Sequence, residues 1–374
     1  MTFATLPDDV ERVRLVVVGA GPMGRAWLHT IVADDDVELV GIADLAVHVA
    51  DEAAAEIGRP GLPTGADGVE LARRTGAHAI VDVTVPAAHH PVTLAALRAG
   101  IPVLGEKPAA ATVAQVLSLA AAAELTGRLF MVSQSRRYND QLFAARERAR
   151  DLGRAGILSV DFFQSPRFGG FRDEMASPLL LDMAIHQFDM ARFLLGADPV
   201  SVLCDEYNPA WSWYAGDAAA TAAFEFDGGA RFVFTGSWCS PGAETSWNGS
   251  WRLSAEHGTL LWDGDNPSTM DAGGAAPPAV EVAAPGAGIA GSLREFTAAL
   301  RTGADPMGRV HENILSLAMV EAAMLSAREG RRVALDEVLD ASLALALDAE
   351  RDAEVRAVMS GWESARDALS SGAV

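Results

Sequence analysis

The chain has 374 residues, half of them hydrophobic, and a formal net charge of −21. This length favours two domains, and an acidic chain without a basic block argues against nucleic acid and anionic membranes as partners. Apolar runs stay shorter than the roughly 18 residues of a membrane span, and the N-terminus lacks the features of a secretory signal, so we expect a cytoplasmic protein without a membrane partner.

Strands and helices alternate through the first 135 residues. The expected strands are continuously apolar, which is typical of a parallel sheet covered on both faces. They cover residues 15–18, 37–44, 78–86, 102–108 and 129–135. Expected helices follow the first strand, reach about residue 57 after the second, and cover 91–100 and 112–126. The pattern predicts an α/β Rossmann domain over residues 1–135.

The rest of the chain, residues 136–374, has a different pattern. Helices are expected over 140–152, 179–196, 290–301 and 310–329 and in the tail from Asp336, with strands over 157–165, 201–207, 218–227, 230–239, 250–258 and 258–264. Gly228–Gly229 indicates a hairpin turn, and residues 166–178 and 265–279 are expected to be loops. We expect an α+β domain with an open, largely antiparallel sheet and a helical C-terminal tail.

A glycine turn follows the first strand. Gly19, Gly21 and Gly24 match G-x-G-x-x-G, with Pro22 and Met23 between the last two glycines. Asp44 ends the second strand at the spacing expected of a ribose-binding acid. Its carboxylate accepts hydrogen bonds from a ribose and repels a 2′-phosphate, so the sequence predicts a dinucleotide site that prefers NAD to NADP.

Lys107 is the only lysine of the chain, whereas every other basic side chain apart from histidine is arginine. Lysine is a compact ammonium that can donate to a hydroxyl and change its pKa on burial, which arginine does not do. This exception indicates a functional role for Lys107.

Three of the polar residues in the largely apolar helix expected over 179–196 share one spacing pattern. Asp182, His186 and Asp189 are spaced i, i+4 and i+7, so an α-helix places them on one face. Asp189 is kept out of the catalytic set because it can pair with an arginine such as Arg192. One histidine and two aspartates on one helix lack a known metal-ligand spacing, and no metal is expected.

Several motifs in order resemble the family of glucose–fructose oxidoreductase, inositol dehydrogenase and MocA. They are the glycine turn, the segment from Thr84 to Pro86 with His90 downstream, Ala99–Gly100, Glu106–Lys107–Pro108, the segment "SRRYND" from Ser135 to Asp140, and Asp182 with His186. The sequence departs from the family pattern at Val85, at Ala184 and in "ASPLLLD", where the family often has glycines.

The resemblance implies that Thr84, Pro86, His90, Glu106 and Lys107 contribute to the cofactor site. It also implies that Lys107 and His186 meet across the domain cleft beside the nicotinamide, where neutral imidazole accepts the hydroxyl proton. Asp182 could orient His186 or contact the substrate. Arg136, Tyr138 and Arg167 are candidate substrate contacts, although the same residues could serve interdomain packing.

These observations predict an NAD-dependent oxidoreductase acting on a secondary alcohol of a sugar, cyclitol or related polyol, and the family implies a homodimer or homotetramer. Five tryptophans between Trp211 and Trp251 could pack on a sugar, or could form sheet core or a subunit interface. Two alternatives remain open: a catalytically silent dinucleotide-binding sensor or regulator, and a reductase with a tightly bound cofactor.

Overall fold

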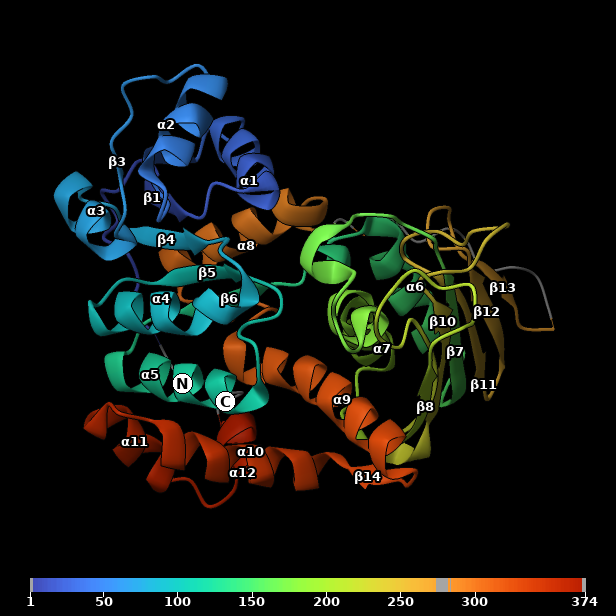
Figure 1. The fold of residues 1–374 in the computed structure, drawn as a ribbon. Helices are drawn as coiled ribbons and strands as arrows, with labels where there is room; N and C mark the ends of the chain where they lie inside the picture. Colours follow the sequence, from blue (N-terminus) through green and yellow to red (C-terminus); the bar gives the residue numbers. More distant parts are fainter. Residues whose placement is uncertain (1–2, 274–281, 283, 372–374) are drawn as a thin grey trace. The chain divides into compact units, whose positions relative to one another are not determined.

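The computed structural model describes residues 3–273, 282 and 284–371, which form two compact units (Figure 1). Unit 1 comprises Met1–Ser135, Pro285–Ile314 and Leu339–Val374, and unit 2 comprises Arg136–Ala284 and Leu315–Val338. The units therefore differ from the expected division into 1–135 and 136–374, because two C-terminal segments pack with the N-terminal sheet.

Unit 1 contains a six-stranded parallel sheet with the order β3-β2-β1-β4-β5-β6. The strands are β1 (Val13–Val18), β2 (Val37–Ala43), β3 (Thr64–Gly65), β4 (Ala79–Asp82), β5 (Val103–Glu106) and β6 (Phe130–Ser133). The intervening helices are α1 (Pro22–Val32), α2 (Val47–Glu56), α3 (Gly68–Thr75), α4 (Pro86–Arg98) and α5 (Val113–Thr126). This strand order is that of a dinucleotide-binding Rossmann fold, as the sequence predicted.

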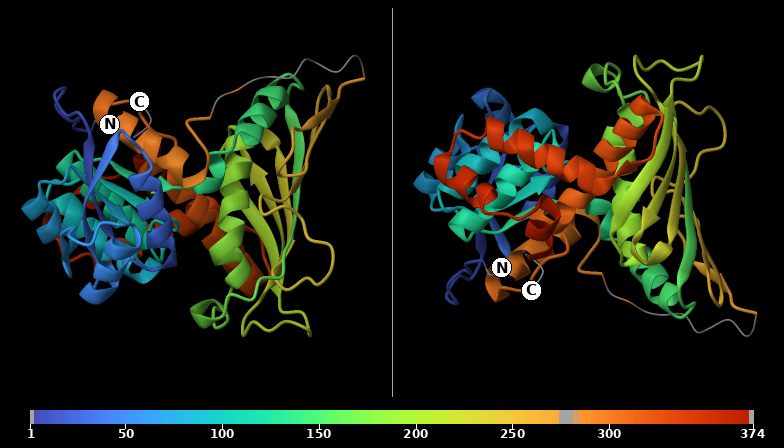
Figure 2. Two further views of the ribbon diagram at one scale, coloured as in Figure 1. Left: turned by 90° about the horizontal axis from the view of Figure 1, so that it is seen from above. Right: turned by 90° about the horizontal axis from the view of Figure 1, so that it is seen from below.

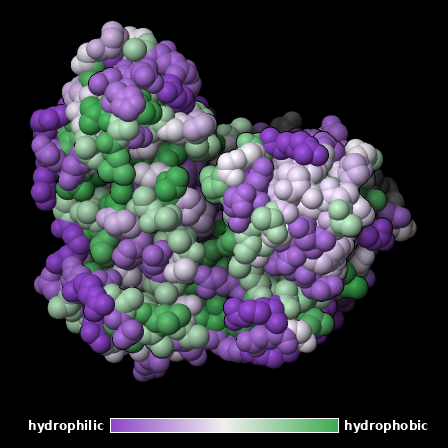
Figure 3. Space-filling model, viewed as in Figure 1, coloured by the Kyte–Doolittle hydropathy of each residue, from purple (hydrophilic) through white to green (hydrophobic). Residues whose placement is uncertain are grey.

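Two elements of this unit differ from the sequence-based expectation. Helix α3 lies where no helix was expected; Asp67 caps its N-terminus and Gly76 ends it in the left-handed conformation. Helix α4 begins at Pro86, five residues earlier than expected, because a proline fits the first turn of a helix and Pro91 is accommodated inside it. Hydrophilic residues gather over α2 and α3 in the space-filling view (Figure 3).

The C-terminal segments complete unit 1. Helices α8 (Gly288–Thr302), α11 (Ala353–Ser360) and α12 (Ala365–Ser371) belong to it, together with most of α10 (Leu335–Ala349). Helix α11 packs on α5, and α8 packs on α1 and β6. Val355 and Met359 of α11 are buried, so the tail is part of the core of this unit.

Unit 2 contains one eight-stranded sheet with the order β13-β12-β11-β7-β10-β9-β8-β14. Its strands are β7 (Ala155–Phe163), β8 (Pro199–Tyr207), β9 (Ala219–Phe226), β10 (Arg231–Ser237), β11 (Ser250–Ala255), β12 (Gly258–Trp262), β13 (Thr269–Asp271) and β14 (Val333–Ala334). Among these described strands, only β7 and β10 pair in parallel, so the expected largely antiparallel sheet is confirmed. Part of the expected loop 265–279 is β13, and residues 274–279 lie outside the described residues.

Helices cover one face of this sheet (Figure 2). They are α6 (Asp140–Arg150), α7 (Ile185–Leu195) and α9 (Val310–Glu329). The first turn of α9, up to Ile314, belongs to unit 1. Phe188 of α7 packs on Phe224, Phe232 and Phe234 of the sheet with ring centroids 4.8 to 6.0 Å apart. The predicted hairpin is confirmed, since β9 and β10 join through Gly228 and Gly229.

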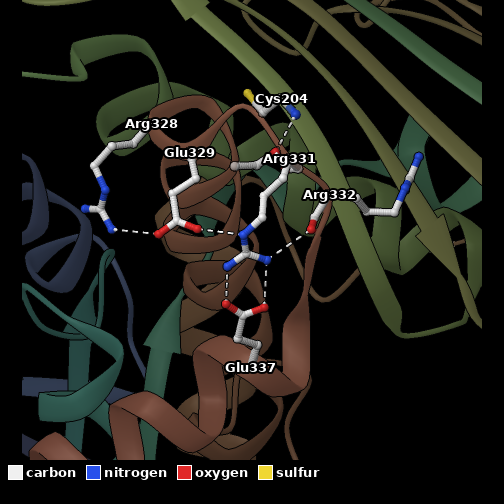
Figure 4. A network of polar contacts seen from close by, with 7 residues as sticks. Cys204, Arg328, Glu329, Arg331, Arg332 and Glu337 are labelled. Atoms are coloured by element: carbon white, nitrogen blue, oxygen red, sulfur yellow. Dashed lines mark hydrogen bonds and ion pairs between the residues drawn. The ribbon is translucent and has the colours of Figure 1, made fainter.

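Polar contacts fasten the end of α9 to the sheet and to the start of α10 (Figure 4). Arg331 donates to both carboxylate oxygens of Glu337 and to Glu329. The Ser326 hydroxyl accepts from the backbone N–H of Cys204 at 2.9 Å. None of the described helices has the length and apolar character needed to cross a bilayer.

Candidate functional site

The glycine turn joins β1 to α1 at the carboxyl edge of the unit 1 sheet. Gly19 has a φ of 100°, and a Cβ there would lie 2.6 Å from the carbonyl oxygen of Val83. A Cβ on Gly24 would lie 2.1 Å from the carbonyl oxygen of Gly19. Both positions therefore require glycine, whereas Gly21 has open space beside it.

The N-terminus of α1 is exposed at this turn. Gly21 is the N-cap and Pro22 the first helical residue, and no side chain caps the helix. Gly21, Pro22 and Met23 are all exposed. Free N–H groups and the positive end of a helix dipole suit an anion such as pyrophosphate.

Asp44 follows β2 and lies beside the glycine turn. One carboxylate oxygen accepts from the backbone N–H of Ala20 and the other from that of Ala46, both at 2.9 Å. The carboxylate is held in place by the backbone and keeps further lone pairs for a ligand. Leu45 is 91% exposed and Val85, after β4, is 59% exposed, so two apolar side chains are also exposed at this edge.

Two adjacent histidines follow Thr84 on α4, and their surroundings differ. His89 is buried, with Nε2 2.9 Å from the carbonyl oxygen of Thr84 and Nδ1 2.7 Å from that of Pro108. It therefore bridges the segments that follow β4 and β5. His89 is not among the site residues predicted from the sequence, although it directly precedes the predicted His90.

His90 belongs to a different network. Its Nε2 lies 3.0 Å from the hydroxyl of Ser118 on α5, and that hydroxyl donates to Glu350. Burial lowers the pKa of His90, and the Glu350 carboxylate raises it in opposition. These contacts connect α4, α5 and the chain after α10. That His90 also contributes to the cofactor site stays a prediction.

Glu106 and Lys107 stand at the end of β5. The Trp27 indole N–H of α1 donates to one carboxylate oxygen of Glu106 at 2.8 Å, and the Lys107 amide donates to the other at 3.1 Å. Burial raises the pKa of Glu106, whereas the Trp27 bond and the Lys107 charge lower it. Glu106 thus connects α1 to β5, and Lys107 follows at the same sheet edge as the glycine turn.

In unit 2 the expected continuous α-helix over 179–196 is wrong in its first part. Residues Leu179–Ala184 form a π-helix, and α7 begins at Ile185. Single π turns inside helices often occur at functional sites. The wider turn of the π-helix changes the expected i, i+4 alignment of Asp182 and His186 on one helix face. Asp182 pairs with the Arg172 guanidinium at 2.6 Å, and His186 is buried, with 5% of its surface exposed.

Asp189 has a structural partner, but it is not the expected Arg192. The guanidinium of Arg137 donates to both oxygens of Asp189 at 2.9 and 2.6 Å, and the Ser316 hydroxyl donates at 2.8 Å. Arg192 pairs instead with Asp198 at 3.2 Å. Asp189 is 1% exposed, so this bidentate pair is part of the core of unit 2.

The three candidate substrate contacts lie in different surroundings within unit 2. Arg136 donates to the side chain of Asn248 at 3.1 Å and lies over the ring of Trp247. Burial lowers the pKa of Arg136. Tyr138 is buried, and Arg167 is exposed and stacks 3.9 Å from the ring centre of Trp213.

The tryptophan cluster divides between core and surface. Trp238 and Trp251 are buried, so for these two the expected sheet core is correct. Trp211 is 65% exposed and Trp247 is 38% exposed. Phe168 and Phe171 precede the π-helix and are also more than half exposed, and Arg172 lies over both rings. Residues Gly170–Arg172 form a 3-10 helix inside the expected loop 166–178. The surface of unit 2 therefore offers aromatic and guanidinium groups together.

The residues of unit 1 fit a dinucleotide. A tight glycine turn, an uncapped helix N-terminus and an anchored carboxylate after β2 lie at one sheet edge, where ligands bind in open parallel sheets. Among the residues that the structure describes, no group of three or more His, Cys, Asp or Glu side chains could hold a metal ion.

Comparison with known proteins agrees with this geometry. Residues 13–134 match the sequence model of an oxidoreductase family with an NAD-binding Rossmann fold, and residues 148–261 match the GFO/IDH/MocA C-terminal domain. The chain is 28% identical to D-apiose dehydrogenase of Paraburkholderia graminis, over 87% of this chain and 90% of that protein. It is 27% identical to inositol 2-dehydrogenase of Rhizobium meliloti, over 86% and 99% of the two chains.

A solved structure shares the fold over most of its length. An oxidoreductase from Agrobacterium radiobacter, crystallised with NAD+, L-tartaric acid and magnesium, superimposes with a TM-score of 0.77 at 20% identity. The match covers 88% of this chain and all of that one. The family sequence models together cover more than half of the chain, and two relatives that match 87% and 86% of it are named dehydrogenases. The chain is therefore an oxidoreductase and belongs to the GFO/IDH/MocA family.

Proposed function

We propose that this protein is an NAD-dependent dehydrogenase that moves a hydride between a secondary alcohol of a sugar, cyclitol or related polyol and the nicotinamide. The observation that carries the proposal is the position of Lys107. The only lysine of the chain follows β5 at the same sheet edge as the glycine turn and Asp44.

NAD is the proposed cofactor, and Asp44 is the residue that selects it. Its anchored carboxylate accepts hydrogen bonds from an adenosine ribose and repels the 2′-phosphate of NADP. The exposed side chains of Leu45 and Val85 provide apolar surface for the adenine. The turn that binds the pyrophosphate consists of Gly19, Gly21, Pro22, Met23 and Gly24. Thr84 and Pro86 form another side of the proposed cofactor site. Glu106 contributes indirectly, because it accepts the hydrogen bond of the Trp27 indole N–H and so positions α1 beside β5.

Lys107 and His186 are the proposed catalytic residues. In the oxidative direction Lys107 donates a hydrogen bond to the reacting hydroxyl, and neutral His186 accepts its proton. NAD+ supplies the hydride acceptor when bound, so a carbonyl product, NADH and a protonated His186 result. Asp182, fixed by Arg172, is proposed to contact the substrate or to orient His186.

The substrate class is inferred from the relatives and from the surface of unit 2. Relatives over nearly the whole chain act on D-apiose and inositol, which are a sugar and a cyclitol. Exposed Trp247, Phe168 and Phe171 offer faces for the C–H side of a ring, and Arg136 and Arg172 offer donors for hydroxyls. Tyr138 and Arg167 remain candidate contacts.

A substrate screen tests the proposal. The purified enzyme is mixed with NAD or NADP and a panel of inositols, aldoses and sugar acids, and reduced cofactor is followed by absorbance. We expect turnover with at least one polyol and NAD, and none with Lys107→Met. Tight NAD binding without turnover across the panel would favour the sensor alternative. Cofactor that stays bound through purification, with turnover only when a sugar acceptor is added, would favour the reductase.

We also propose that the protein is a homodimer or homotetramer joined through the face of the unit 2 sheet opposite α6, α7 and α9. The strand register aligns one row of side chains across six strands on that face: Leu203, Ala223, Val233, Ser159, Arg252 and Leu261. Leu203 and Leu261, at the two ends of the row, are 45% and 43% exposed. A second copy would cover this partly apolar surface.

A further inference from the structure

His89 is a buried histidine with backbone carbonyl oxygens at both ring nitrogens. Nδ1 lies 2.7 Å from the oxygen of Pro108 and Nε2 lies 2.9 Å from that of Thr84. Both distances are those of N–H···O hydrogen bonds. A carbonyl oxygen only accepts, and a neutral imidazole carries one N–H. Both contacts are therefore hydrogen bonds only when the ring carries two protons.

Two buried carboxyl groups carry the opposite charge to such a ring when they are ionised. They are Asp82 at the end of β4 and Glu106 at the end of β5, and both are less than a tenth exposed. Burial raises the pKa of each carboxyl, and the charge of His89 lowers both in opposition. Lys107 is the other cation beside Glu106.

The hydrogen bonds around these carboxyl groups favour their ionised forms. Glu106 accepts from two N–H donors, those of Trp27 and Lys107. Asp82 accepts from the amide and the hydroxyl of Thr84 at 3.1 and 2.7 Å, and from the hydroxyl of Thr93 at 3.0 Å. Donors directed at a carboxylate stabilise its charge, which in turn stabilises a cationic ring nearby.

We propose that His89 is a positioning residue that, as an imidazolium, ties the segment after β4 to the segment after β5 and thereby orients Lys107. The ring holds Pro108 on one side of Lys107, while Glu106 is held by Trp27 on the other. The assignment to Lys107 orientation rests on the proposed function. The double protonation of the ring does not.

Neutron diffraction from wild-type crystals at neutral pH tests the protonation directly, and nitrogen-15 spectra of the histidine rings test it in solution. We expect hydrogen on both ring nitrogens of His89. A ring with one hydrogen would overturn the proposal. Neither measurement needs turnover or a variant that folds, so the result stands even if no substrate is found.

The variant His89→Gln tests the positioning role, because its amide cannot donate to both carbonyls across the span of the ring. We expect kcat to fall roughly 10- to 100-fold through misplacement of Lys107, with a much smaller change in the Kd for NAD. The matched control is His257→Gln, at an exposed turn of unit 2. It should keep the wild-type kcat.

A measurement without substrate separates this proposal from the dehydrogenase proposal. Since Lys107 is the only lysine, an amine-directed reagent can modify only its side chain and the N-terminal amine, and the labelling measured at Lys107 itself reports on its environment. The labelling rate should change in His89→Gln and not in His257→Gln. An unchanged rate, or an unchanged kcat, would overturn the positioning role even if the enzyme oxidises a polyol as proposed.

Discussion

Lys107 and His186 are the residues on which the proposed chemistry depends. Lys107→Met and His186→Ala should each lower kcat by about 10²- to 10⁴-fold, the usual contribution of one acid–base group. The Kd for NAD should change much less, because the glycine turn and Asp44 remain. Stopped-flow reduction of NAD and a fluorescence titration measure the two quantities. Wild-type turnover after complete labelling of Lys107 would exclude this mechanism.

Asp44 has a structural role and a proposed role in cofactor choice, and a single substitution tests the second. Its carboxylate accepts hydrogen bonds from the backbone N–H groups of Ala20 and Ala46. The same carboxylate is proposed to exclude NADP. Asp44→Asn keeps one acceptor oxygen but removes the charge that repels a 2′-phosphate. We expect the ratio of kcat/KM for NAD to that for NADP to fall by at least about tenfold, or about 1.4 kcal/mol. An unchanged ratio would show that another residue selects the cofactor.

Glu206 on β8 makes the stability of the protein depend on pH. Burial raises its pKa from 4.5 to about 7, although the Ser177 hydroxyl donates to it at 3.0 Å. The folded state therefore binds a proton more tightly than the unfolded state does. The stability contribution of this group is present below about pH 4.5 and is lost as the pH rises to about 7.

Glu206→Gln removes this dependence. We expect the free energy of unfolding to rise by as much as about 3 kcal/mol at mildly alkaline pH and to match the wild type at acidic pH. Chemical denaturation at both pH values measures this. Glu225→Gln on the neighbouring strand β9 serves as a more exposed control. A variant equally stable to the wild type at alkaline pH would contradict the burial argument.

At the scale of the elements, the C-terminal helix α11 stabilises the N-terminal unit. Met359 is 1% exposed, so Met359→Ala leaves a cavity and should lower the free energy of unfolding by about 2 to 5 kcal/mol. Arg356→Ala, on the exposed face of the same helix, should have little effect. Thermal unfolding measures both. Equal stability of the two variants would mean that the tail does not contribute to the core of unit 1.

At the scale of the whole molecule, the partly apolar face of the unit 2 sheet opposite α6, α7 and α9 predicts self-association. Light scattering at micromolar concentration should give the mass of a dimer or a tetramer. Leu203→Glu and Leu261→Glu place charge at the two ends of the exposed row and should each shift the mass towards that of the monomer. Val200→Glu, also exposed on β8 but outside this row, is the control. A monomeric wild type would exclude the proposal.

The sequence by itself determined the features whose causes are local. Adjacent residues specify each of these features. They are the glycines required by a tight turn, Asp44 at the end of β2, the continuously apolar strands and the Gly228–Gly229 hairpin. The parallel sheet of the Rossmann domain and the largely antiparallel second sheet followed from these patterns. The short helix α3 was missed, although Asp67 and Gly76 mark its two ends.

Only the tertiary structure decided features that depend on partners distant in the chain. The chain entering the π-helix is held by amides of Ala215 and Asp217, which donate to Asp173 and Ala176. The partner of Asp189 is Arg137, because the fold buries that pair together. His89 and His90 are adjacent and of one residue type. They differ because the helix directs one ring toward the carbonyls of Thr84 and Pro108 and the other toward Ser118. The local sequence does not indicate which of the two rings faces which partner.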